Sequence, residues 1–139
     1  MIEFDNRTSL SLHTEVIESI ASSLIDKEIE LIVTDEEEMK EINKTHRNIN
    51  KATDVLSFPY VEMPLSPLGS IVICSLHVEE KSKEFGHTED DEFTLLFIHG
   101  LLHLLGYDHE VDSGEMREEE ARIIKEFNLP QSLIIRTEG

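Results

Sequence analysis

Apolar residues recur along the chain at two spacings, and the alternation of these spacings predicts the order of its secondary structure. Leu12, Val16 and Ile20 lie four residues apart, as on one face of an amphipathic helix, which we place at about residues 9–25. Short apolar runs at 29–33, 55–59 and 69–75 predict strands, and residues 1–5 predict another short strand. The runs at 29–33 and 69–75 contain several β-branched residues, and Pro59 ends the run at 55–59.

Capping signals indicate where the other helices begin. The run Thr34-Asp35-Glu36-Glu37 has the spacing of a capping box and predicts a helix of about ten residues that buries Met39 and Ile42. A polar helix is predicted at about 76–85, followed by a break at 86–88 and a long apolar helix. Cap spacing at 112–115 predicts a last helix, which buries Met116, Ile123 and Phe127 and exposes the glutamates at 118–120.

The order β-α-β-α-β-β-α-α-α predicts an α+β fold, close to an α/β layer, with one mixed sheet of about four strands packed against about five helices. The 139 residues contain no repeat, low-complexity tract or linker, which predicts a single domain over 1–139. Residues 93–107 carry no Asp, Glu, Lys or Arg. This stretch is too short to span a bilayer comfortably, so it predicts a central buried helix.

The chain is strongly acidic, with 30 acidic and 12 basic residues and a formal net charge of −18. This charge argues against general affinity for nucleic acid or anionic membranes, although it permits a local basic patch. The single cysteine, Cys74, excludes an internal disulfide and is expected to be a small buried hydrophobe. Together with an N-terminus that lacks signal-peptide features, this predicts a cytoplasmic protein without membrane association.

The run from His99 to His109 carries the clearest chemical signal. His99 and His103 lie one helical turn apart and so project from the same face. Gly106 can end the helix in a left-handed conformation, which allows His109 to return to the same point. Three converging imidazoles with an open fourth position are typical of a catalytic zinc site, here one Zn²⁺ per chain.

Asp108 and Glu110 leave alternatives open at this site. Either carboxylate could supply a fourth protein ligand and close the site as a structural zinc centre. Asp108 could instead accept an imidazole N–H from a ligand and fix its tautomer, or simply be a turn residue. The other histidines, at positions 13, 46, 77 and 87, are scattered and are expected to lie on the surface or to have local structural roles.

The histidine spacing matches the zinc-peptidase pattern H-E-x-x-H-x-x-G-x-x-H except at its second position. Gly100 stands there, where those peptidases carry the glutamate that takes a proton from water. The ligand spacing therefore survives while the peptidase base is lost. Hydrolysis of another kind of substrate remains a reasonable expectation, because zinc lowers the pKa of bound water to ~7.

A basic segment precedes the strand at 55–59. Lys44, Arg47 and Lys51 fall within eight residues, and no acidic residue interrupts from 42 to 53. A guanidinium near a zinc site would suit a phosphodiester, because arginine binds phosphate through two parallel hydrogen bonds. A solvated loop is the alternative interpretation of this segment.

These motifs resemble those of the YbeY endoribonucleases. The resemblance rests on the run at 99–109, on Arg47 followed by Lys51-Ala52-Thr53-Asp54-Val55-Leu56-Ser57-Phe58-Pro59, and on the run at 68–74. It implies a single-strand-specific, metal-dependent endoribonuclease that matures the 3′ end of small-subunit rRNA and acts in ribosome quality control. Single-stranded RNA, the ribosome or its small subunit, and possible protein partners are the implied contacts.

The resemblance also implies roles for individual residues. The three signature histidines carry over to His99, His103 and His109 as zinc ligands, with His103 also assigned to catalysis. The functional arginine carries over to Arg47, for contact with phosphate or RNA, and we add Lys44 and Lys51 as side chains that steer the strand.

One departure from the family pattern concerns Ser70, where the family usually has aspartate. Serine can keep a hydrogen bond there but not a charge. The alternatives to a nuclease are a zinc-dependent peptidase or amidase with an unplaced base, and a non-enzymatic, zinc-stabilised ribosome-associated factor.

Overall fold

The computed structural model describes residues 2–60, 66–108, 111–130 and 133. Over these residues, four strands and five helices follow one another in the predicted order. They are β1 (Ile2–Asn6), α1 (Glu15–Leu24), β2 (Ile29–Thr34), α2 (Glu36–Arg47), β3 (Val55–Pro59), β4 (Gly69–Cys74), α3 (Ser75–Phe85), α4 (Glu89–Leu104) and α5 (Glu115–Glu126).

The strands form one mixed sheet in the order β1-β2-β4-β3. β1, β2 and β4 are parallel, with Leu31 opposite Ile71, and β3 runs antiparallel to β4, with Leu56 opposite Val72. All six residues of β4 are buried, as expected for a strand that is covered on both faces. The predicted α+β class with a mixed four-stranded sheet is therefore confirmed.

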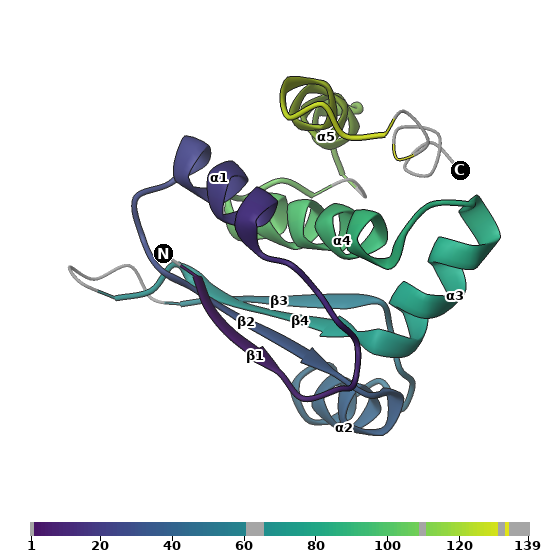
Figure 1. Ribbon diagram of the computed structural model, residues 1–139. Helices are drawn as coiled ribbons and strands as arrows, with labels where there is room; N and C mark the ends of the chain where they lie inside the picture. The colour runs from purple at the N-terminus through teal and green to yellow at the C-terminus, as the bar shows by residue number, and fades with distance from the viewer. Residues whose placement is uncertain (1, 61–65, 109–110, 131–132, 134–139) are drawn as a thin grey trace.

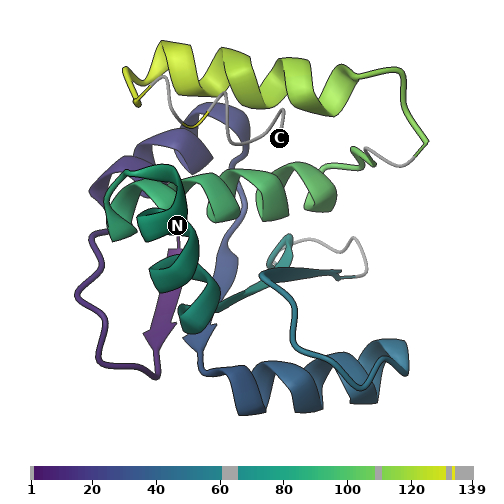
Figure 2. The same ribbon diagram turned by 90° about the vertical axis from the view of Figure 1, so that its right-hand side faces the viewer.

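The helices build layers on both faces of this sheet. In Figure 1, α1 and α4 lie on one face and α2 on the other, while α5 lies outside α4 and makes a further layer. Figure 2, turned by 90°, shows the same order from α2 through the sheet and α4 to α5. Helix α4 is thus enclosed between the sheet and outer helices, which explains its nearly continuous apolar sequence.

Most of the hydrophobic core lies around α4. Phe93, Phe97, Ile98 and Leu101 are fully buried and pack with side chains of α1, β2, β4 and α5. A smaller cluster under α2 contains Met39, Leu56, Val72 and Cys74. The predicted central buried helix is confirmed, and among the described residues no helix is long and apolar enough to cross a membrane.

The turn between α3 and α4 has the predicted break and a reciprocal cap. Gly86 ends α3 with a φ of +71°, a backbone conformation that favours glycine. The Thr88 hydroxyl accepts from Asp91 N at 3.0 Å, and the Asp91 carboxylate accepts from Thr88 N at 3.3 Å. This capping box sets the start of α4 and hence the position of its histidines.

The first helix is shorter than its spacing predicts. It begins at Glu15, whereas the sequence places it from about residue 9. The Asn6 side chain holds the preceding segment in a turn by accepting from Thr8 N at 3.0 Å and donating to Leu10 O at 2.8 Å. Leu10 and Leu12 then pack against the core at alternate positions of a non-helical segment.

The cap of α2 is displaced by one residue from its prediction. Asp35, rather than Thr34, is the N-cap, and its side chain accepts from Glu38 N at 2.8 Å. Met39 is fully buried and Ile42 partly buried, as predicted. The two prolines within residues 63–68 predict a loop there, and part of that segment lies outside the described residues.

Cys74 is a buried residue at the end of β4, and burial raises the pKa of its thiol. We expect the folded protein to react slowly with a thiol reagent at pH 8, because both access and thiolate formation are suppressed. In urea, one thiol per chain should react within minutes. Rapid stoichiometric labelling of the folded protein, followed by absorbance, would contradict the buried position.

Candidate active site

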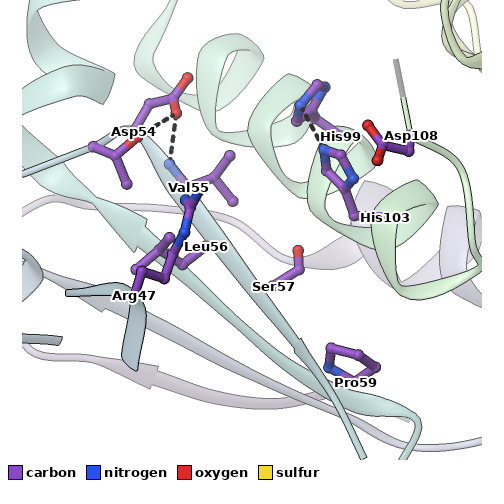
Figure 3. A pocket seen from close by; sticks show the side chains of 10 residues that line it. Arg47, Asp54, Val55, Leu56, Ser57, Pro59, His99, His103 and Asp108 are labelled. Carbon is purple, nitrogen blue, oxygen red and sulfur yellow. Dashed lines mark hydrogen bonds between the residues drawn. The ribbon is translucent and has the colours of Figure 1, made fainter. Parts of the chain in front are cut away.

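Two histidines project together from the last two turns of α4. The imidazole rings of His99 and His103 have their centroids 4.7 Å apart, with planes inclined by 80°. Their Nε2 atoms approach to 3.2 Å, as Figure 3 shows. The predicted shared face of these two side chains is therefore confirmed.

The other nitrogen of each ring faces an oxygen acceptor. His99 Nδ1 lies 2.7 Å from Glu120 Oε1, and His103 Nδ1 lies 3.0 Å from the carbonyl oxygen of Tyr107. These acceptors favour the tautomer with a proton on Nδ1, which directs a lone pair from each Nε2 toward the same point. With both rings in this tautomer, a cation between the two nitrogens, a proton or a metal ion, would offset the repulsion of their lone pairs.

A zinc ion fits this donor pair. Tetrahedral Zn²⁺ with bonds of 2.0–2.1 Å to imidazole nitrogen places two ligand atoms about 3.3 Å apart, close to the 3.2 Å between the two Nε2 atoms. Within the described part of the chain, no group of three His, Cys, Asp or Glu side chains could hold a metal ion. The third predicted ligand, His109, lies outside the described residues, as does Glu110, so the three-histidine site stays a prediction.

The end of α4 follows from a local hydrogen-bond pattern. Gly106 has a φ of +101° and donates to the carbonyl of His103, and Tyr107 donates to the carbonyl of Leu102. This is a Schellman motif, with glycine in the left-handed position as predicted. The reversal turns the Tyr107 carbonyl back toward His103 Nδ1. The helix terminus itself thus orients one candidate ligand.

A cavity of about 480 Å³ lies in front of the two imidazoles. Its described lining includes Arg47, Asp54 and Ser57 on the side of α2 and β3, and His99, His103 and Asp108 on the side of α4 (Figure 3). Because β3 is an edge strand, side chains from elements on both faces of the sheet reach this cavity. Folding therefore brings Arg47 and the histidine pair, far apart in sequence, to one site.

Two of the predicted basic residues stand apart from this cavity. Among the described lining residues there is Arg47 but neither Lys44 nor Lys51. The carbonyl of Lys51 accepts a hydrogen bond from the buried Asn43 side chain at 2.7 Å, which secures the loop between α2 and β3. Steering of a strand by the two lysines stays a prediction.

Asp108 lines the cavity beside the histidines. For His99 and His103, the two candidate ligands within the described residues, the Nδ1 partners are Glu120 and the Tyr107 carbonyl. A supporting role for Asp108 toward a metal ligand stays a prediction.

Glu120 is a site residue that the sequence analysis missed. It was expected on the exposed face of the last helix, but only 2% of its surface is exposed, so this expectation was wrong. Met116, Glu120, Ile123 and Ile124 form the buried side of α5, a helical spacing that could have placed the glutamate on the apolar face. Nothing local to the sequence shows that His99 would meet it there.

Gly100 lies where α4 approaches the sheet most closely. Its carbonyl accepts from the Ser57 hydroxyl at 2.9 Å, and a Cβ at this position would lie 2.9 Å from Ile71 Cγ2 and 3.1 Å from Ser57 Oγ. The position that holds the catalytic glutamate in zinc peptidases therefore faces the packed helix–sheet interface in this chain. Because even a Cβ would be too close to Ile71 at this position, the packing cannot accommodate the side chain of a catalytic glutamate.

Comparison with known proteins agrees with the motifs that line this cavity. Residues 2–128 match the family model described as Endoribonuclease YbeY. The chain belongs to the YbeY endoribonuclease family. This membership makes the protein an endoribonuclease, a hydrolase that cleaves RNA within the strand.

Individual relatives cover nearly the whole chain. The chain is 87% identical to Endoribonuclease YbeY of Sulfurimonas denitrificans over 139 residues, with both chains covered in full, and 59% identical to that of Nautilia profundicola, with 99% of each covered. It is also similar to a solution structure from Thermotoga maritima, with a TM-score of 0.63 and 32% identity over 91% of this chain and 89% of that one.

The close approach at Gly100 predicts that alanine at this position lowers the stability of the protein, whereas helix propensity alone predicts that it raises the stability. Alanine favours a helix interior over glycine by about 1 kcal/mol, yet Gly100→Ala should destabilise the protein by about 1–2 kcal/mol, because its methyl group overpacks the contact with Ile71. Urea denaturation would measure the change. A stabilised variant would show that α4 and the sheet are not in tight contact at this position.

Proposed function

We propose that this protein is a zinc-dependent, single-strand-specific endoribonuclease that matures the 3′ end of small-subunit rRNA and acts in ribosome quality control in the cytoplasm. The observation that carries the proposal is the convergence of two Nε2 atoms 3.2 Å apart on a cavity that Arg47 also lines. Family membership supports RNA as the substrate. The ribosome or its small subunit is the proposed partner.

His99, His103 and His109 are the proposed holders of the metal. When bound, zinc supplies a Lewis acid that polarises water or a phosphate oxygen. The Tyr107 carbonyl holds the imidazole of His103 in the tautomer that a metal requires. Arg47 binds the phosphate and stabilises the charge that develops on it during cleavage.

The charges around the cavity give the metal a second role, in substrate binding. Among the described lining residues, one guanidinium, that of Arg47, faces the two carboxylates of Asp54 and Asp108. This excess of negative charge disfavours binding of a phosphodiester, and the chain as a whole has a formal net charge of −18. A divalent cation on the histidines reverses the local sign. RNA binding at this site is therefore expected to need the metal as much as cleavage does.

Removing the metal should weaken RNA binding as well as abolish cleavage. We expect the chelator-treated protein to bind a short single-stranded RNA at least about tenfold more weakly, a change of about 1.4 kcal/mol. Fluorescence anisotropy at fixed ionic strength measures this binding, and restoring one equivalent of Zn²⁺ should reverse the loss. Equal affinity with and without metal would contradict the electrostatic role.

His103→Ala should remove bound zinc and RNA cleavage together. The assay uses single-stranded RNA that contains a small-subunit rRNA 3′ end, with zinc measured in the same protein samples. His13→Ala is the control, because His13 is exposed and pairs with Asp90 away from the described cavity lining. Cleavage by a zinc-free His103→Ala protein would defeat the proposed chemistry, and ribosome association without cleavage by the parent would favour a non-enzymatic factor.

Arg47→Glu should lower the cleavage rate by about 100-fold or more while zinc content stays near that of the parent, because the change reverses a charge at the phosphate. Lys40→Glu is the matched control, with the same charge change at an exposed position of the same helix. Equal rates for the two variants would dismiss the role of Arg47 at the phosphate.

A further inference from the structure

The carboxylate of Glu120 occupies an unusual position for a charged group. It projects from the apolar side of α5 among Met116, Ile123 and Ile124, and its side chain is 3% exposed. Burying a carboxylate is unfavourable unless hydrogen bonds or an opposite charge compensate for the lost hydration. A carboxylate in this position therefore requires a partner that compensates its charge.

The compensation that the described residues offer is incomplete. Glu120 Oε1 lies 2.7 Å from Nδ1 of His99, and within the described residues no lysine or arginine forms an ion pair with this carboxylate. The nearby guanidinium of Arg122 binds Glu119 and Glu126 instead. The buried charge therefore faces an imidazole, and a neutral imidazole leaves it without a cation.

A cation on the opposite side of the His99 ring would complete the arrangement. The Nε2 atom of His99 points toward Nε2 of His103, where the proposed zinc would bind. A carboxylate that accepts a hydrogen bond from Nδ1–H keeps that proton in place, leaves the lone pair of Nε2 for the metal and offsets part of the metal charge.

We infer that Glu120 is a positioning residue for the metal site, acting through His99. The inference rests on the zinc site of the proposed function and extends it to a residue of a separate helix. Because His99 lies on α4 and Glu120 on α5, metal binding and the packing of α5 against α4 must stabilise each other. Under this inference, zinc binding would also stabilise the packing of α5 against α4.

Zinc affinity of the intact protein, measured without RNA, tests this role. Glu120→Gln keeps the shape of the side chain but loses its charge, and we expect it to bind Zn²⁺ about 10–100-fold more weakly than the parent. Competition with a chromophoric chelator gives the dissociation constants. Glu119→Gln is the matched control: it removes the same charge from the adjacent residue, which binds Arg122, and should retain the affinity of the parent.

A variant that changes only packing distinguishes the proposed role of Glu120 from a purely structural role in α5. Ile123→Val loosens the same buried side of α5 but leaves the carboxylate in place, so its zinc affinity should fall much less than that of Glu120→Gln. The ¹⁵N NMR chemical shifts of the His99 ring, measured on the zinc-free proteins, report which ring nitrogen carries the proton. The parent should hold His99 protonated at Nδ1, and Glu120→Gln should shift part of the population to Nε2.

Each outcome decides the matter. Weakened zinc binding in Glu120→Gln, with near-parent affinity in Glu119→Gln and Ile123→Val, supports the inference. Tight binding by the parent and unchanged binding by Glu120→Gln would overturn the role of Glu120 and leave the proposed function intact. A parent protein that binds no zinc would overturn both the inference and the metal dependence of the proposed function.

Discussion

The close contact between α4 and the sheet is the constraint on which the rest of the site depends. At Gly100 the helix backbone lies so near β3 and β4 that a Cβ would come within 3.1 Å of both Ile71 and Ser57. Gly69 makes a similar approach on the strand side, where a Cβ would lie 2.7 Å from Leu104 Cδ2. This proximity places the C-terminal half of α4 beside β3, so the histidine pair and Arg47 share one cavity.

The two imidazoles are oriented at two different levels of structure. For His103 the acceptor is a main-chain carbonyl, supplied by the turn that ends the same helix. For His99 the acceptor is a carboxylate from α5, 21 residues later in the chain. The first arrangement follows from a Schellman motif with glycine at its left-handed position. The second exists only because α5 packs outside α4 (Figures 1 and 2).

Charge links the proposed chemistry of the site to the proposed metal. A protein of net charge −18 repels RNA at long range, and the described cavity lining itself carries carboxylates beside Arg47. A divalent ion changes the sign of the field at the point where a phosphate would bind. Under the proposed function, RNA recognition is confined to the region around the metal, because the rest of this acidic protein disfavours nonspecific nucleic-acid binding.

The sequence by itself determined the order of the elements, the mixed sheet, the central histidine helix and the left-handed turn at Gly106, because these follow from local periodicity, capping and glycine chemistry. It misjudged the start of α1, where the Asn6 side chain holds a turn, and the exposure of Glu120. Tertiary structure alone decided that Glu120 contacts His99 and that Gly100 packs against Ile71, and it gave Arg47 and the histidines one shared cavity. Such contacts join residues from different elements, and no local pattern specifies which faces will pack together.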